Sequence, residues 1–301
     1  MNKKKFFVSM LITVLVVATI ALGLWVAKLF FGNTLAEKFG EDLSNRIIGT
    51  LDKQTDDKVN ILLLGLDKDR TRADVIMVVS VDPNRNRVDI LSIPRDTRVQ
   101  HSPNHFDKIN HSMGYKNPEE TTIKMVKQIT GMPIHYYCEV DFAGFRNVID
   151  ILGGVEFNVP VDMHYEDPEQ DLYIHVNKGW QVLDGKNAEG VVRFRATYPG
   201  GDNDRIPVQQ DFIHALFEQK LKPQYIVKAP SIISEIYNNV TTNFSVAKAT
   251  GYIPMLKNLN KDSLKTHTLP GEGQYIGNVS YFVYDKEATK KLISEEFGYS
   301  Q

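Results

Sequence analysis

The sequence has 301 residues, of which 42% are hydrophobic and 24% are charged, and these proportions are ordinary for a folded protein. Its 35 basic and 37 acidic residues give a formal net charge of −2, which argues against non-specific binding to nucleic acid. The single cysteine, Cys138, excludes a disulfide within the chain.

An apolar segment dominates the N-terminus. Residues 6–27 carry no charged side chain, and about 20 apolar residues suffice to cross a bilayer. Three lysines at positions 3–5 predict that the N-terminus stays inside the cell. The alternative is a cleaved signal peptide, whose apolar core typically has only about 7–15 residues. The predicted organisation is a cytoplasmic tail at residues 1–5, a transmembrane helix at 6–28, an extracellular stalk at 29–57 and an extracellular domain at 58–301.

Three hydrophobic strands open the predicted domain, at residues 60–67, 74–82 and 87–97. Apolar runs this continuous are typical of strands covered on both faces, at the centre of an α/β domain. Residues 83–86 are rich in turn formers, so the second and third strands should form a hairpin. Ligands of such sheets bind where strands end, and these strand ends carry acids and an arginine.

Helices and short strands fill the rest of the chain. Asn117 and Asp141 are each predicted to cap the helix that follows. No linker is evident after Asp57, which indicates one domain beyond the stalk. The predicted helices are residues 118–130, 142–152, 186–192, 205–221, 225–237, 246–259 and 286–296, and the predicted strands are 134–140, 155–161, 266–270 and 279–283.

Arginines after the midpoint of the chain are candidates for an anion site. Arg193 and Arg195 point to the same side only in an extended segment, which we expect because the helix should end near Val192. Arg205 and Gln209 are four residues apart in the first turn of a helix, where free N–H groups favour an anion.

Arg95, at the end of the third strand, completes this candidate set. Guanidinium groups match phosphate oxygens well, so four converging arginines would suit a multiply charged phosphate. The alternative is that each arginine lies on the surface or pairs with a local acid. Those local acids are Asp96, Asp202 and Asp204.

Asp67 and Asp74 flank the loop between the first two strands and are candidate metal ligands. Magnesium usually takes only one or two carboxylates and completes its shell with phosphate and water. The alternative is that these acids cap the loop or pair with Arg70 and Arg72.

Other common sites find little support. His101 and His105 are four apart, but the residues between them indicate a turn, so a zinc site is not expected. The sequence has neither a GxSxG elbow nor a Walker GxxxxGK[ST] loop. Cys138 lies in an apolar strand and is expected in the core.

A series of short motifs occurs in a characteristic order over about residues 58–220. Together they resemble the LytR–CpsA–Psr family of Gram-positive bacteria. The motifs are NILLLGLD at 60–67, RAD at 72–74, SIPRDT at 92–97, KINH at 108–111, DFAGF at 141–145, IDILGGV at 149–155, GWQVLDG at 179–185, VRFR at 192–195, GDNDR at 201–205 and QQ at 209–210.

The resemblance implies a fold and an activity. The fold would be an α/β sandwich whose central mixed, mostly antiparallel sheet is flanked by helices. The activity would be a phosphotransferase reaction that moves an anionic glycopolymer, such as wall teichoic acid or capsule, from an undecaprenyl-diphosphate carrier to peptidoglycan. The acceptor would be the C6 hydroxyl of N-acetylmuramic acid, and Mg²⁺, or else Mn²⁺, would assist.

The resemblance also implies roles for residues. Arg95, Arg193, Arg195 and Arg205 match the family positions that grip the pyrophosphate, and Gln209 matches a glutamine near the phosphate. Asp67 and Asp74 match the acidic positions near the magnesium ion, so the predicted catalytic residues are Arg95, Asp67 and Asp74. An apolar pocket would hold the prenyl tail. Its candidate walls are Phe142, Phe145, Val148, Ile149, Phe212 and Leu216.

Two positions depart from the family pattern. Asp204 stands where glycine is common, and Val208 stands where a basic residue is common. These changes put the polymer's identity and the phosphate affinity in doubt more than the reaction type. A hydrolase acting on the same lipid pyrophosphate and a non-catalytic, membrane-anchored glycan-binding module stay open as alternatives, and no general base is assigned.

Overall fold

The computed structural model describes residues 58–168, 172–196 and 205–299. The predicted tail, transmembrane helix and stalk lie outside these residues, as does the Gly-Asp part of the GDNDR motif. Within the described ranges, no helix has the length and apolar character needed to span a bilayer.

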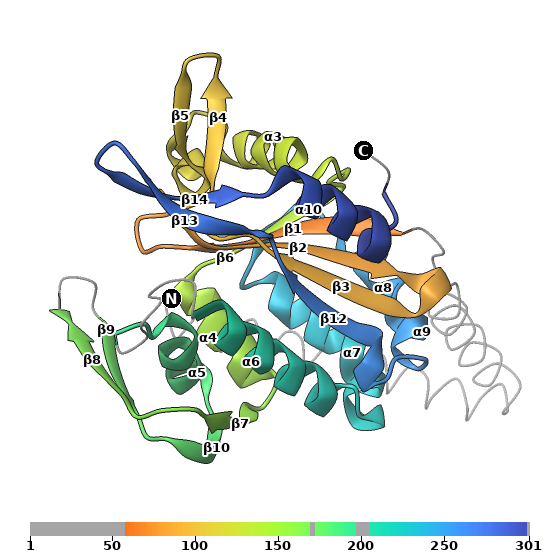
Figure 1. Cartoon of the computed structure of the whole chain (residues 1–301). Coiled ribbons are helices and arrows are strands. Elements are labelled where there is room, and N and C mark those ends of the chain that lie inside the picture. Colours follow the sequence, from red (N-terminus) through yellow and green to blue (C-terminus); the bar gives the residue numbers. More distant parts are fainter. Residues whose placement is uncertain (1–57, 169–171, 197–204, 300–301) are drawn as a thin grey trace, which may run out of the picture. The chain divides into compact units, whose positions relative to one another are not determined.

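A six-stranded mixed sheet lies at the centre (Figure 1). The pairs β1–β2, β2–β3 and β11–β6 are antiparallel, whereas β1–β6 and β3–β12 are parallel. The predicted hairpin of the second and third strands and the predicted mixed sheet are both confirmed. In spatial order the strands are β11 (Thr241–Thr242), β6 (Tyr136–Val140), β1 (Val59–Leu66), β2 (Ala73–Asp82), β3 (Arg87–Ser92) and β12 (Leu264–Thr268).

One face of this sheet is sealed. Leu62, Leu64 and Leu66 alternate along β1, are each 0% exposed, and point into the largest core. Helices α3 (Pro118–Thr130) and α10 (Lys286–Leu292) cover this face in Figure 1. The burial of these side chains provides the main hydrophobic stabilisation of the sheet.

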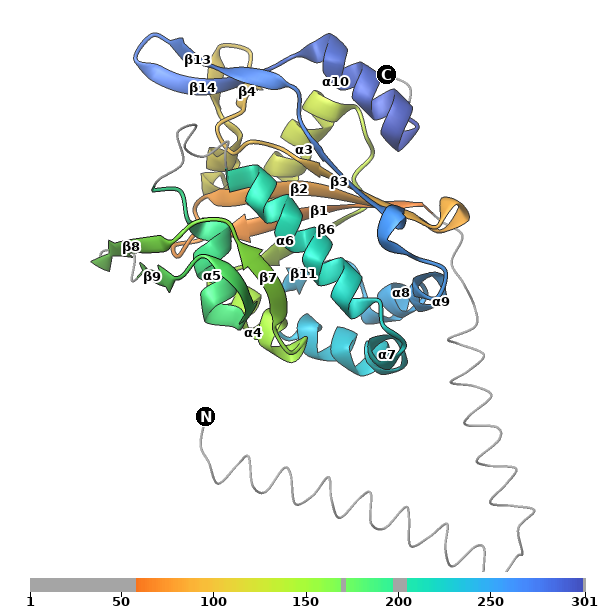
Figure 2. The same cartoon turned by 60° about the horizontal axis from the view of Figure 1, so that its bottom comes forward.

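The opposite face is only partly covered. Helix α6 (Arg205–Lys220) crosses it, and α7 (Pro223–Tyr237) lies beside it (Figure 2). A small buried cluster of Met77, Ile90 and Leu264 is surrounded there by side chains that stay half-buried. These half-buried side chains are Leu63, Val75, Val79 and Val88 from the sheet and Ile213 and Phe217 from α6.

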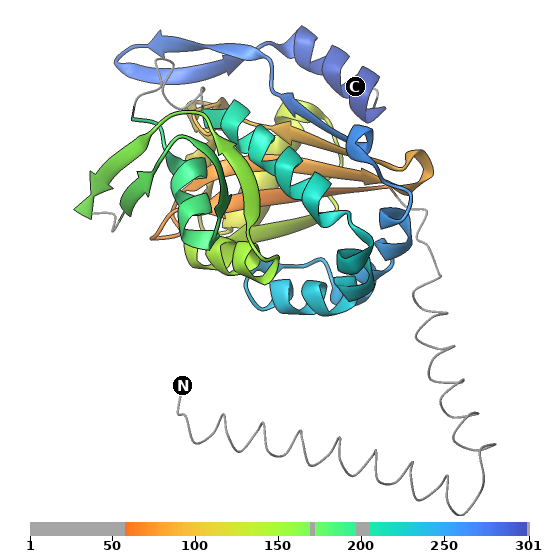
Figure 3. The same cartoon turned by 90° about the horizontal axis from the view of Figure 1, so that it is seen from below.

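A second core lies beside α6, seen from below in Figure 3. It packs α4 (Phe142–Ile151) and α5 (Gly185–Arg193) against short strands and α6. Four two-stranded ribbons complete the described sheets: β7 (Val155–Val159) with β10 (Gly179–Leu183), β8 (Met163–Asp167) with β9 (Leu172–Val176), β4 (Arg98–Ser102) with β5 (His105–Lys108), and β13 (Gly271–Ile276) with β14 (Val279–Tyr284).

Several local predictions are corrected. Asn117 does not cap α3, because its side chain donates to Glu120 at 3.0 Å instead of accepting from a backbone N–H. The predicted helix at 246–259 is two short helices, α8 (Val246–Thr250) and α9 (Ile253–Leu256). Asp141 does cap α4, accepting from the Gly144 N–H at 2.8 Å, as predicted.

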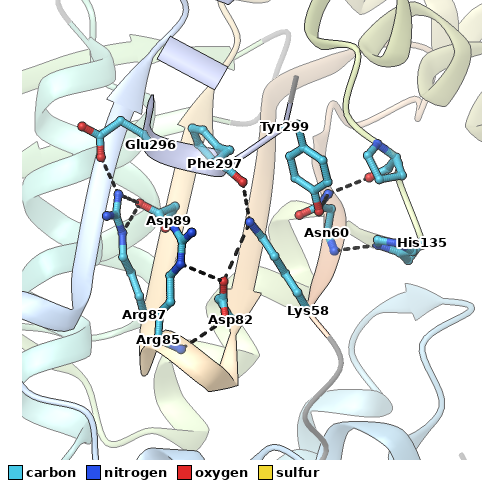
Figure 4. Close-up of polar contacts among 11 residues, drawn as sticks. Lys58, Asn60, Asp82, Arg85, Arg87, Asp89, His135, Glu296, Phe297 and Tyr299 are labelled. Carbon is cyan, nitrogen blue, oxygen red and sulfur yellow. Dashed lines mark hydrogen bonds and ion pairs between the residues drawn. The ribbon is translucent and has the colours of Figure 1, made fainter. Parts of the chain in front are cut away.

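The C-terminal segment is tied to the start of β1 (Figure 4). Lys58 donates to the carbonyl of Phe297, and its ammonium lies 4.6 Å from the ring centre of Tyr299. The Asn60 amide donates to the Tyr299 hydroxyl at 2.9 Å. These contacts hold the first residues of the sheet against the last helical turn of the chain.

Candidate active site

A pocket opens where β2 begins, β3 ends and α6 begins. It is a small hollow that is partly open to solvent. Four of the seven predicted site residues line it: Asp74, Arg95, Arg205 and Gln209. The remaining lining residues are Val75, Ile76, Met77, Ser92, Ile93, Pro94 and Ile206.

A β-bulge turns Asp74 toward this pocket. Leu66 pairs with Ala73 and Gly65 pairs with Val75, so Asp74 is the extra residue of the bulge. A bulge breaks the regular alternation of side chains and re-aims the residue it inserts. The order of burial along β2 fits this, because Asp74 and Val75 are both half-buried between buried neighbours.

Arg95 and Asp74 form an ion pair across the end of the hairpin. Arg95 Nη1 donates to Asp74 Oδ1 at 2.6 Å, and the two side chains are 20% and 26% exposed. Antiparallel pairing explains the contact, because the end of β3 lies beside the start of β2. Asp96, the local acid considered for Arg95, instead faces Lys108, with 3.1 Å between the charged groups.

Arg205 and Gln209 anchor the start of α6. Arg205 is 5% exposed and donates from Nη2 to the backbone oxygen of Asp74 at 3.0 Å. Gln209 is 6% exposed and donates to the backbone oxygen of Val192 at 3.0 Å. The first turn of α6 is therefore held between β2 and the end of α5, and Arg205 and Gln209 both line the pocket, in keeping with the predicted shared face.

Arg193 and Arg195 are separated by the buried Phe194, which is 1% exposed. Helix α5 ends at Arg193, one residue later than predicted, and Phe194 is extended. Arg193 donates to Glu189 at 2.6 Å and lies 3.7 Å from the ring centre of Phe142. Arg195 is exposed, and neither arginine lines the pocket.

Sequence reasoning missed Glu189, which is 6% exposed. Its two carboxylate oxygens accept from Arg193 and from Arg146. The spacing of four residues between Glu189 and Arg193 on a helix was a signal for the first of these contacts. The second contact joins α5 to α4 and follows only from the tertiary structure.

Asp67 closes the loop between β1 and β2. Its Oδ1 accepts from the N–H groups of Thr71 at 2.9 Å and Arg72 at 3.2 Å. Asp67 Oδ1 therefore caps the loop, which was one of the alternatives to metal binding. The second oxygen, Oδ2, lies 3.8 Å from Arg72 Nε, the ion pair that was the other alternative. Arg70, in a left-handed conformation with φ 57°, turns away to Glu139 at 2.6 Å.

The two acids suit a hard divalent cation in their chemistry. Carboxylate oxygens are preferred magnesium ligands, and one or two carboxylates are the usual number. Asp74 lines the pocket, and the backbone brings Asp67 to the same strand ends, since Asp67 N donates to Arg72 O at 3.0 Å. Asp74 and Asp67 are thus the residues that would hold such an ion.

Two other groups with possible reactivity, the Cys138 thiol and a cluster of two acids and a histidine, lie outside this pocket. Cys138 is half-buried and not part of a core cluster of the described residues, contrary to the prediction, but burial still raises the pKa of its thiol to about 11, so the thiol stays protonated at neutral pH. Within the described ranges, one group has metal-ligand spacing, namely Asp89, His267 and Glu296. Arg87 already bonds both of its carboxylates, so this group is a charge network.

The predicted wall residues belong mostly to the second core. Ile149 is 1% exposed and Phe212 is 2% exposed, so both are packed core residues. Phe145 and Leu216 pack against the same core, and Phe142 lies under Arg193. The incompletely covered apolar surface is instead the face of the central sheet beneath α6.

The LytR_cpsA_psr family model matches residues 29–297. The chain belongs to the LytR–CpsA–Psr family. TagV of Bacillus subtilis, named a polyisoprenyl-teichoic acid–peptidoglycan teichoic acid transferase, is 28% identical over 219 residues, which cover 70% of this chain and 56% of TagV. LcpB of Corynebacterium glutamicum, named a probable cell wall biosynthesis protein, is 33% identical over 209 residues, or 68% of this chain and 48% of LcpB.

Solved structures of LytR–CpsA–Psr proteins share the fold. The crystal structure of B. subtilis TagV has a TM-score of 0.71 and 29% identity, and the match covers 82% of this chain and all of that one. TagT bound to LIIa-WTA has a TM-score of 0.66 and 25% identity, covering 79% of this chain and 89% of that one. In sequence, the chain spans only about half to two thirds of the curated relatives it matches.

Proposed function

We propose that this protein transfers an anionic glycopolymer from a polyprenyl-diphosphate carrier to peptidoglycan. The carrier would be undecaprenyl diphosphate, the polymer wall teichoic acid, capsule or a related glycan, and the acceptor the C6 hydroxyl of N-acetylmuramic acid. The names of TagV and TagU, and the structure of TagT bound to LIIa-WTA, support this class of reaction for the family.

The pocket's own chemistry carries the proposal. Arg95 and Arg205 provide fixed positive charge, while Val75 and Met77 on the same wall belong to the half-covered face of the sheet. A prenyl diphosphate has an anionic head joined to an apolar tail, so it needs such a transition from charged to apolar lining. Buried guanidinium groups also bind phosphate oxygens more strongly than exposed ones, because the local dielectric is low.

Arg95 is the residue best placed to act on the reacting phosphate. The acceptor hydroxyl would attack the polymer-proximal phosphorus and release its proton to solvent, and the bond to the prenyl phosphate would break with its electron pair leaving on that phosphate. A fixed guanidinium stabilises the charge that develops on the phosphoryl oxygens without reorganising. Arg205 and Gln209 would then hold the wall of the site, since both already bond to neighbouring backbone.

Mg²⁺, or Mn²⁺ in its place, is the proposed cofactor, and Asp74 and Asp67 would hold it. Bound there, the ion would neutralise charge on the phosphoryl oxygens. The carboxylate of Asp74 balances Arg95 in the ligand-free protein, and both charges therefore stay compensated. We also propose that the apolar segment at residues 6–28 anchors the chain in the cell membrane with the domain outside.

The test is a transfer assay with the purified full chain. The reaction contains a prenyl-diphosphate-linked teichoic acid precursor, peptidoglycan fragments and Mg²⁺, and products are followed by mass spectrometry. Polymer joined to peptidoglycan by wild type, and lost with Arg95→Ala, is the expected result. Prenyl phosphate release at equal rates with and without peptidoglycan would identify a hydrolase, and no turnover with unchanged glycan binding would identify a binding module.

A further inference from the structure

The β13–β14 ribbon ends in an unusually apolar tip. Tyr275 is 80% exposed, Ile276 is 40% exposed and Val279 is 43% exposed. Ile276 pairs with Val279 across a two-residue turn of Gly277 and Asn278, so the apolar side chains flank the turn itself. Gly277 has φ 62°, which suits the tight turns that join two antiparallel strands.

This tip carries no charge, and the one charged residue of the two strands, Glu272, lies near the start of β13, away from the turn. Residues 273–284 contain no acidic or basic side chain, and every residue of β13 is exposed. Exposed hairpin ends are normally polar, because an apolar side chain in water gains nothing from folding. An exposed apolar cluster therefore indicates a surface that meets an apolar partner.

The β13–β14 ribbon is anchored to the segment that directly follows Arg95. Phe282 on β14 bridges to Thr97, and its N–H donates to the backbone oxygen of Asp96 at 2.9 Å. These two residues directly follow Arg95 in the chain. Val279 is three residues from Phe282, so the tip lies about 10 Å along β14 from this anchor. Figure 1 shows the ribbon projecting past the end of the sheet where β1 ends and β2 begins.

The chain enters the domain at the opposite end of the sheet. Lys58 and the start of β1 lie at the far end from the bulge that holds Asp74. A lipid-linked pyrophosphate can reach the pocket only if the pocket end approaches the bilayer.

We infer that the β13–β14 tip is a membrane-contact element that inserts its apolar side chains into the bilayer interface beside the active site. The inference rests on the proposed function, because a lipid-embedded substrate is what requires the contact. Tyrosine suits the interface, with an apolar ring and a polar hydroxyl, while Ile276 and Val279 enter the acyl region. A partner protein or a glycan strand would be recognised by its own contacts and would not follow lipid composition.

The test places a fluorescent probe at the tip. The full chain carries Asn278→Cys in a Cys138→Ala background, is labelled with an environment-sensitive maleimide dye, and is reconstituted into vesicles of phosphatidylethanolamine and phosphatidylglycerol. The matched control is Asn104→Cys, at the polar turn of the β4–β5 ribbon. We expect a blue-shifted emission and quenching by doxyl-labelled lipids at position 278 but not at position 104.

Several outcomes would overturn the inference. They are equal quenching at both positions, no quenching at either, a blue shift without lipid quenching, which marks a protein or glycan contact, and failure of the chain to associate with the vesicles.

A second variant separates this inference from the proposed function. Ile276→Ser with Val279→Ser removes the two aliphatic side chains of the tip without touching a pocket residue. It should lower transfer from a vesicle-embedded donor by about tenfold or more, while binding of water-soluble geranyl diphosphate stays unchanged. Unchanged transfer overturns the membrane contact alone. A wild-type chain that shows tip quenching but never binds geranyl diphosphate supports the contact and removes the proposed function.

Discussion

Charge pairing defines the candidate site at the scale of single residues. Arg95 is held by Asp74, and Arg193 is held by Glu189, each at 2.6 Å. Both arginines are mostly buried, and burying a guanidinium group without a partner is costly. The carboxylates therefore compensate the arginine charges within the protein itself, and an anion bound at the proposed site would compete with them.

Arg95→Ala should lower the transfer rate by about 10²-fold or more, by analogy with the loss of one oxyanion donor. Arg95→Lys keeps the positive charge but loses the planar guanidinium group that can bind two oxygens at once, so its rate should lie between those of wild type and Arg95→Ala. The measurement is kcat/KM with a soluble prenyl-diphosphate donor, with circular dichroism to check the fold. A rate near wild type for Arg95→Ala would remove Arg95 from the chemistry.

Glu189→Gln should uncouple Arg193 from its support. The side chain of Glu189 is 8% exposed and that of Arg193 is 12% exposed, and leaving one member of such a pair unmatched costs about 3–5 kcal/mol. Urea unfolding of Glu189→Gln, Arg193→Gln and the double variant gives the coupling energy. We expect the loss of unfolding free energy in the double variant to be much smaller than the sum of the losses in the two single variants. Additive losses would show that the pair contributes nothing specific.

The sequence predicted the location of individual site residues where the end of a strand or the start of a helix determines it. Asp74, Arg95, Arg205 and Gln209 follow strand ends or a helix start, and these positions bring them to one pocket. The conformation of the loop between β1 and β2 could not be predicted from the sequence. The carboxylate of Asp67 could serve a metal or its own loop, and the hydrogen bonds from Thr71 and Arg72 depend on a backbone turn that the sequence does not reveal.

At the scale of elements, the strands that are buried in the central sheet were predicted, whereas several exposed strands were missed. The continuous apolar runs of β1, β2 and β3 reflect strands that lie inside the sheet, so they were found. The ribbon strands β4, β5 and β13 were missed because they are short and mostly polar or exposed. An exposed strand has no core face, and the alternation that marks a strand in sequence is then absent.

The last helical turn of the chain should give stability a specific pH dependence. A hydrogen bond from Arg87 lowers the pKa of Glu296 below the value of 4.5 that is usual for a glutamate. A lowered folded-state pKa contributes stability that is present above pH 4.5 and lost as pH falls through the folded pKa. Urea unfolding should therefore show Glu296→Gln well below wild type at neutral pH, with the gap closing in acid.

The matched control for this prediction is Glu287→Gln on the neighbouring helix. The side chain of Glu287 is 85% exposed and lies 3.5 Å from Lys290, so its pair should contribute little at any pH. A gap between wild type and Glu296→Gln that stays constant from neutral pH to pH 3 would show that the Arg87 contact is not what ties down the C-terminal segment.

At the scale of the whole molecule, the two faces of the central sheet differ in how completely helices cover them. The sealed face provides the large core, with Leu62, Leu64 and Leu66 fully buried. The face under α6 is left half-covered, and its side chains continue the apolar wall of the pocket through Val75 and Met77. The pocket and the large core nevertheless share Ile76 and Ile93, so changes at these two lining residues should also lower stability.

Ligand and metal should stabilise the molecule together. Geranyl diphosphate with Mg²⁺, at about 100 times its Kd, should add about 2.7 kcal/mol and raise Tm by about 5–10 °C. EDTA should remove most of this shift, since Asp74 and Arg95 then stay paired. Asp74→Asn should lose the magnesium-dependent part, while Asp69→Asn, an exposed acid in the same loop, should keep it. An equal shift with EDTA would mean that the arginines bind the diphosphate without a metal.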